Sequence, residues 1–185
     1  EHAERLKRAE DNTSASEIYR VGWSWGANVI PRAAGSAAVK KLIFTAGAFH
    51  PATLRHKVKS RPVPESKHSL IWEAMRTNPL RTAREVAPYA LYNDVESVPR
   101  LNEIISSLRQ HPRRELEPGL VHFPDLPMEY ILMTNDRTLL PESQREIAEA
   151  LGIVPVEFDG GHAAMYSEEK AKKLARLYIH LANKN

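Results

Sequence analysis

The sequence predicts an α/β fold built on a mostly parallel sheet, and two patterns in its 185 residues carry that prediction. Between residues 18 and 49, a short strand-like run, a stretch of helical composition and a continuous apolar run follow one another. Strand, helix and strand in this order form a βαβ unit, whose two strands lie parallel. From residue 128 onward, apolar runs again alternate with helical patterns. The length suits one domain with a sizeable core.

The first elements precede the βαβ unit. Residues 1–10 are charged and favour a helix, which the turn-forming residues 11–14 should end. Ile18 and Val21 belong to a short strand that runs into Gly22. We therefore expect one helix ahead of the first strand.

The helix and the second strand of the unit come next. Residues 27–35 read ANVIPRAAG, which is helical in composition. Pro31 would lie in the first turns, where a missing N–H is tolerated, and Gly35 would end the helix. The run VKKLIFTAGAF at 39–49 has a continuous apolar centre, which is typical of a strand buried on both faces.

The middle of the chain differs in character and divides the sequence into three parts. Most of the 13 prolines lie in residues 51–127, among short amphipathic segments such as 69–76 and 98–111. No strong strand pattern occurs there, so we expect a helical cap over the carboxyl edge of the sheet. Residues 1–50 and 128–185 would then form the two parts of the core.

The last part predicts two strands and two helices. The expected elements are a strand at 128–136, a helix at 141–152, a strand at 154–162 and a helix at 167–184. Pro141 would occupy the first position of its helix, and Ser167 would be the N-cap of the last one.

Composition excludes several classes of function. The net charge is only +3, and no basic run carries interleaved aromatic residues, so nucleic-acid binding is not expected. No apolar stretch approaches the roughly 18 residues of a membrane helix. Cysteine is absent, which removes disulfides and thiolate metal sites and fits a cytoplasmic location. The 8 histidines show no H-x-x-H spacing, so no catalytic metal is expected.

One short motif carries candidate chemistry. Residues 22–26 read GWSWG, a G-x-S-x-G pattern between a strand and a helical stretch. In this pattern the serine lies on a sharp, strained turn, and the flanking positions approach too closely for side chains. The two glycines are Gly22 and Gly26. The motif alone is a weak signal, because an ordinary turn serine would also fit it.

Two further residues strengthen the motif. A serine hydroxyl needs a base to take its proton, and the base needs an acid to orient it. Asp136 follows the strand at 128–136, and His162 follows the strand at 154–162. Together with Ser24 they occur in the order serine, acid, histidine, each at the carboxyl end of a strand, where open α/β sheets place their sites.

These segments resemble the α/β-hydrolases, and within them the small-esterase and hydroxynitrile-lyase-like branch. The matching pieces are VGWSWGANVI, KLIFTAGAFHP, ALYNDVE, YILMTNDRTLLPESQREIAEALG and VEFDGGHAAMYSEEKAKKLARLY, which together extend over most of the chain. The resemblance implies Ser24 as nucleophile, His162 as base and Asp136 as the orienting acid. It also implies the backbone N–H of Trp25 as one donor of an oxyanion hole.

The sequence departs from that family in three ways. The resemblance implies further strands, and a loop carrying a second oxyanion donor, before the nucleophile strand, and these have no counterpart in the 185 residues. We therefore expect a preceding segment or a second chain to complete the sheet. Relatives often carry histidine where this chain has Trp23, and the related lyases carry lysine where this chain has Ala163.

The predicted function is hydrolysis of small apolar carboxylic esters through an acyl-enzyme, with no cofactor. Two alternatives remain: a hydroxynitrile lyase, which Ala163 disfavours, and a non-catalytic or incomplete hydrolase fold that binds a small ligand. Candidate pocket residues are Trp23, His50, Trp72 and Met75. Cap packing is the commoner role for residues placed like Trp72 and Met75, and a surface position explains His50 as well as substrate contact does.

Overall fold

The computed structural model describes residues 2–33, 37–49 and 123–184, with the single positions 78, 81 and 85. Nearly all of the predicted cap at 51–127 lies outside the described residues, including its segments 69–76 and 98–111. The cap and the limits of the three parts therefore stay predictions, and Gly35 itself lies outside the described residues.

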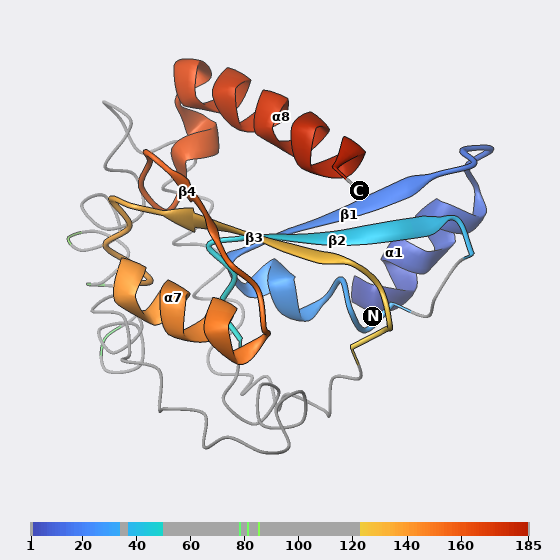
Figure 1. Cartoon of the computed structure of the whole chain (residues 1–185), viewed down its shortest axis with the longest axis horizontal. Helices are drawn as coiled ribbons and strands as arrows, with labels where there is room; N and C mark the ends of the chain where they lie inside the picture. The colour runs from blue at the N-terminus through green and yellow to red at the C-terminus, as the bar shows by residue number, and fades with distance from the viewer. Residues whose placement is uncertain are drawn as a thin grey trace.

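The described core is a four-stranded parallel sheet, as the sequence predicts (Figure 1). The strands follow the chain in the order β1-β2-β3-β4, and each pairs in parallel with the next. Their bounds are Ile18–Trp23 for β1, Val39–Thr45 for β2, Met128–Met133 for β3 and Val156–Phe158 for β4. No described strand pairs with the outer edge of β1, so completion of the sheet by another segment or chain stays a prediction.

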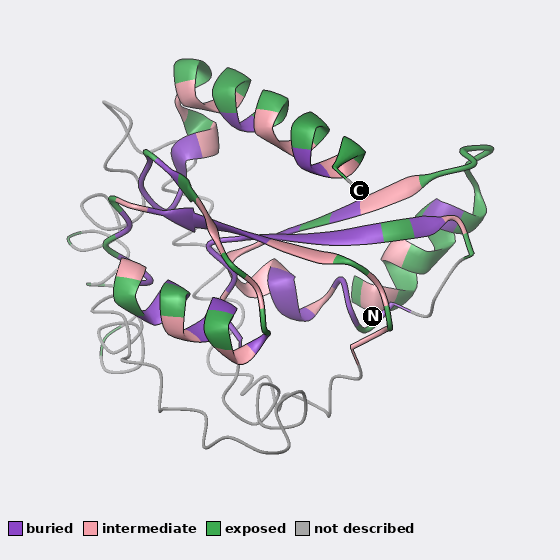
Figure 2. Cartoon of the chain, viewed as in Figure 1, coloured by how far each residue is buried: buried purple, intermediate pink, exposed green. Residues whose placement is uncertain are grey.

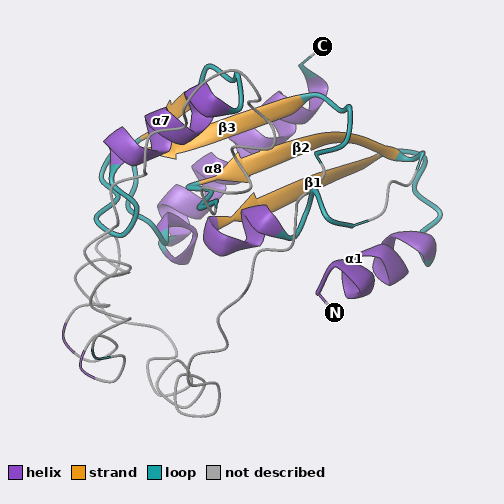
Figure 3. Cartoon of the chain, turned by 90° about the horizontal axis from the view of Figure 1, so that it is seen from below, coloured by secondary structure: helices purple, strands orange, loops and turns teal. Residues whose placement is uncertain are grey.

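Helices cover both faces of this sheet (Figures 1 and 3). Helix α8, Glu168–Asn183, lies on one face. Helices α1, His2–Asp11, and α7, Pro141–Ala150, lie on the other face with the short 3₁₀ helix η1, Ser24–Asn28. The sheet is thus the middle layer of three.

The alternation of side chains along β2 explains its continuous apolar run. Leu42 and Phe44 belong to the cluster that includes Ile147 of α7. Ile43 points the other way, into the cluster that includes Leu174 of α8. Because helices cover both faces, the side chains of β2 are buried whichever face they point to, as the purple centre of the sheet shows (Figure 2).

The predicted helix over residues 27–35 is wrong for its described part, residues 27–33. The element begins earlier, at Ser24, and is a 3₁₀ helix that ends at Asn28 and passes into turns. Pro31 lies beyond the end of this helix and not in its first turns. Proline has no N–H to donate, so the helix does not continue through this position. The guanidinium of Arg20 instead donates to the carbonyls of Ile30 and Ala33, which the turns leave available.

Other boundaries agree with the sequence, although the strands are shorter than predicted. Strand β2 stops at Thr45 because Ala46 takes a φ of 43°, outside the extended region. Helix α7 begins with Pro141 at its first position, as predicted. Ser167 is the N-cap residue of α8, but its side chain makes no capping hydrogen bond. Across the part of the chain that the structure describes, no helix is both long and apolar enough to span a membrane.

Candidate active site

The turn at Ser24 has the strain that its motif predicts. Strand β1 ends at Trp23, and Ser24 follows with a φ of 52°, in the left-handed region that is unfavourable for residues other than glycine. A Cβ on Gly22 would lie 2.9 Å from the Cα of Ala27 and 3.0 Å from the carbonyl oxygen of Gly26. Glycine at position 22 is therefore required for this turn.

Gly26 does not share that requirement, so the prediction for it is wrong. A Cβ built on Gly26 meets no heavy atom within 4 Å among the described residues. The close approach is between the Cβ position of residue 22 and the backbone of Gly26 and Ala27, not between two side-chain positions. Among the described residues, the turn therefore requires glycine at position 22 and leaves room for a side chain at position 26.

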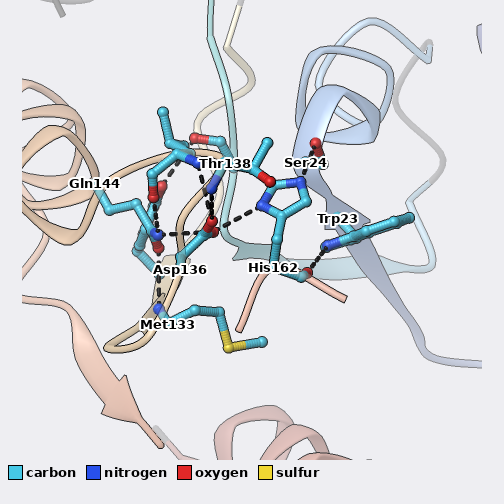
Figure 4. Close-up of polar contacts among 10 residues, drawn as sticks. Trp23, Ser24, Met133, Asp136, Thr138, Gln144 and His162 are labelled. Carbon is cyan, nitrogen blue, oxygen red and sulfur yellow. Dashed lines mark hydrogen bonds and ion pairs between the residues drawn. The ribbon is translucent and has the colours of Figure 1, made fainter. Parts of the chain in front are cut away.

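Ser24, His162 and Asp136 form one chain of hydrogen bonds (Figure 4). The Nε2 atom of His162 lies 2.8 Å from Oγ of Ser24, and its Nδ1 atom lies 2.7 Å from Oδ2 of Asp136. His162 and Asp136 are each only 2% exposed. Three side chains that are far apart in the sequence therefore meet at the carboxyl edge of the sheet, as expected from the strand ends.

Backbone and side-chain groups of the described residues hold the carboxylate of Asp136. Its Oδ1 accepts the backbone N–H groups of Thr138 at 2.7 Å and Leu139 at 2.9 Å. Its Oδ2 accepts the His162 ring and the side-chain amide of Gln144, the latter at 3.0 Å. These donors fix the direction in which the buried carboxylate points.

Gln144 is a site residue that the sequence did not predict. Its Nε2 donates to Asp136 and also to the carbonyl of Leu139 at 2.7 Å, while its Oε1 accepts the N–H of Met133 at 3.0 Å. The side chain is fully buried. Its signals in the sequence were its place eight residues after Asp136 and its inclusion in the matching piece YILMTNDRTLLPESQREIAEALG, and neither reveals the contact.

Trp23 lies against His162. Its indole N–H donates to the carbonyl oxygen of His162 at 2.6 Å, and the two ring centroids are 5.4 Å apart at an angle of 47°. Trp23 is half-buried and packs on the cluster beneath α8. Its predicted place in a substrate pocket stays a prediction.

Tyr130 shows that the surroundings of Asp136 are dry. Its hydroxyl donates to the carbonyl of Gly47 at 2.8 Å, and the whole residue is buried. Burial raises the pKa of the Tyr130 phenol well above its usual value, and the negative charge of Asp136 raises it further. Charges near this position are therefore weakly screened by water.

The other predicted site residues have different outcomes. Trp25 directly follows Ser24 in η1 and is half-buried, and its role as an oxyanion donor stays a prediction. His50, Trp72 and Met75 lie outside the described residues. Within the described ranges, no group of three or more His, Asp or Glu side chains is arranged to hold a metal ion.

The site combines a strained serine after the first of four parallel strands with a histidine and a buried aspartate. The serine is hydrogen-bonded to the histidine, and the histidine to the aspartate. This arrangement is typical of α/β proteins with a nucleophile turn. The sequence profile of the Alpha/beta hydrolase family matches residues 13–177. The chain therefore belongs to this family, as its resemblance implied. No curated protein matches it significantly.

Solved structures share the fold at low sequence identity. A hydrolase from Oleispira antarctica has a TM-score of 0.60 at 13% identity, with 99% of this chain and 71% of that one covered. Polyneuridine aldehyde esterase has a TM-score of 0.60 at 13% identity, covering 98% and 78%. The pyrethroid hydrolase PytH has a TM-score of 0.62 at 15% identity, covering 98% and 75%.

Proposed function

We propose that this protein hydrolyses small, mostly apolar carboxylic esters through an acyl-enzyme on Ser24. The observation that carries the proposal is the pair of hydrogen bonds that His162 makes, at 2.8 Å to Ser24 and 2.7 Å to Asp136. A serine hydroxyl is a weak nucleophile until such a base takes its proton. The names of two structural neighbours, an esterase and a pyrethroid hydrolase, agree with the proposal.

The reaction proceeds in two halves. Oγ of Ser24 attacks the ester carbonyl while Nε2 of His162 accepts its proton, and the resulting imidazolium then protonates the departing alcohol. In the second half, water attacks the acyl-enzyme while His162 takes a proton from it. The imidazolium then returns that proton to Oγ of Ser24 as the bond to the acyl group breaks, which releases the carboxylic acid.

Asp136 and Trp25 support this chemistry differently. Asp136 accepts the Nδ1–H of His162, which selects the tautomer with a free Nε2 and stabilises the imidazolium. The backbone N–H of Trp25, the residue after the nucleophile, would donate to the oxyanion of the tetrahedral intermediate. Losing such a donor typically lowers kcat about 10²–10³-fold.

Turnover of short-chain aryl esters tests the proposal. We expect the wild-type protein to release the chromogenic alcohol from acetate to hexanoate aryl esters, and Ser24→Ala to lose about 10³-fold or more of that rate. Ser14→Ala, an exposed serine in the loop before β1, is the matched control and should retain full activity. Equal rates for the two variants would contradict the proposal.

A further inference from the structure

Trp23 lies next to Ser24 in the sequence and next to His162 in space. Its indole N–H and the His162 carbonyl are 2.6 Å apart, and its ring lies beside the imidazole. We propose that Trp23 is a positioning residue, which acts on the reaction by fixing the loop that carries His162. The kinetic part of this proposal rests on the proposed function, whereas the structural part does not.

The loop of His162 is tied to both of its partners by the residues that immediately precede them. Trp23, directly before Ser24, donates to the carbonyl of His162. Asn135, directly before Asp136, donates its backbone N–H to the carbonyl of Gly160 at 3.0 Å. The imidazole therefore lies between two anchors, one on the nucleophile strand and one on the acid loop.

This loop needs such anchors because its own sequence is permissive. Strand β4 has only three residues, and two of the three residues between it and His162, Gly160 and Gly161, have no side chain to restrict the backbone. Packing limits one side, since a Cβ on Gly160 would lie 2.8 Å from the Cβ of Ala164. On the other side, the indole N–H of Trp23 donates a hydrogen bond to the backbone carbonyl of His162 itself.

Trp23→Phe separates positioning from general packing, because phenylalanine keeps an aromatic ring and loses the N–H donor. The matched control is Tyr178→Phe, which removes a hydroxyl bonded to Thr45 at 2.9 Å from an aromatic residue on the same cluster. A purely structural role would lower the stability of both variants alike. A positioning role would change the Nδ1–H signal of His162 and the reactivity of Ser24 in the Trp23 variant alone.

The first measurement is proton NMR of the Nδ1–H of His162, whose signal lies far downfield while it is bonded to Asp136. We expect a sharp signal in the wild type and in Tyr178→Phe, and a broadened or shifted one in Trp23→Phe. The second is the rate of phosphonylation by a fluorophosphonate, which should fall about tenfold in Trp23→Phe alone, as expected for one lost hydrogen bond. In ester turnover, the same variant should lower kcat and leave KM unchanged.

An unchanged Nδ1–H signal and an unchanged phosphonylation rate in Trp23→Phe would overturn the proposal. If that variant does not fold, Trp23→Tyr keeps an aromatic ring on a longer side chain with no N–H at the position of the indole nitrogen, and the same two measurements decide. A wild-type protein without ester turnover would contradict the proposed function instead. The NMR comparison does not depend on turnover, so the two failures are distinguishable.

Discussion

The side-chain amide of Gln144 lies 3.0 Å from the carboxylate of Asp136 and connects it to two backbone segments. One is the end of β3, through the N–H of Met133, and the other is the loop before α7, through the carbonyl of Leu139. The neutral side chain of Gln144 therefore orients Asp136, the acid of the proposed catalytic group. Both Nε2 and Oε1 of Gln144 have hydrogen-bond partners in this arrangement.

Replacing Gln144 should affect both activity and stability. Gln144→Leu leaves a buried N–H of Met133 and an oxygen of Asp136 each without one partner, which costs about 1–3 kcal/mol per unsatisfied group. We expect a lower urea midpoint and a drop of about tenfold in kcat. The control is Arg145→Ala. Arg145 is the next residue, is exposed and forms a surface ion pair with Glu157, so its replacement should change the urea midpoint and kcat little. Wild-type kcat in Gln144→Leu would show that this contact does not orient Asp136.

Replacing each of the two glycines of the serine turn by alanine should have very different effects on stability. Gly22→Ala places a Cβ 2.9 Å from a backbone atom, so the strand or η1 must move, at about 1–3 kcal/mol. Gly26→Ala enters free space among the described residues and should be neutral or stabilising by up to about 1 kcal/mol, because it restricts the unfolded chain. Urea unfolding of both variants measures the difference, and similar losses would contradict this account of the turn.

A buried ion pair joins α1 to the nucleophile strand. Arg20, 3% exposed, donates to both oxygens of Glu10, each at 2.7 Å. Glu10→Gln should destabilise the protein by about 3–5 kcal/mol, because it removes the carboxylate charge that lies 2.7 Å from the buried guanidinium. The exposed pair Lys172–Glu168 provides the control, and Lys172→Ala should cost less than about 1 kcal/mol. Equal losses would mean that Arg20 gains solvent or another partner when Glu10 is neutral.

The sequence predicted the elements that depend on local pattern. Continuous apolar runs identified β2 and β3, and the order of strands and helices predicted the parallel sheet. Because the carboxyl ends of parallel strands share one edge, the same patterns predicted that Ser24, Asp136 and His162 would lie near one another.

Contacts that depend on tertiary geometry could not be predicted in this way. Gln144 and Asp136 meet because α7 turns back over the end of β3, and Arg20 meets Glu10 because α1 folds under β1. The helix after Gly26 was misplaced because composition favoured it, whereas the strained turn begins η1 at Ser24 and Pro31 stops its continuation.

The stability of the protein should fall in alkali through Tyr130. Its pKa is raised by burial, so above about pH 10 the unfolded chain loses a proton that the folded protein retains. The unfolded state then binds fewer protons, and the free energy of unfolding decreases as the pH rises. Urea titrations at pH 8 and pH 11 should show a smaller decrease in Tyr130→Phe. The same decrease in both proteins would assign the alkaline loss to other groups.

The central claim is that Ser24 is the nucleophile and His162 its base, and covalent labelling tests it most directly. The wild-type protein should react with a fluorophosphonate so that Oγ of Ser24 bonds to phosphorus and fluoride departs. Peptide mass spectrometry should then place a single adduct on the peptide containing GWSWG. Ser24→Ala and His162→Ala should remain unlabelled, and Ser14→Ala should label like the wild type. A folded wild-type protein that stays unmodified, or that carries its adduct on another serine, would contradict the account.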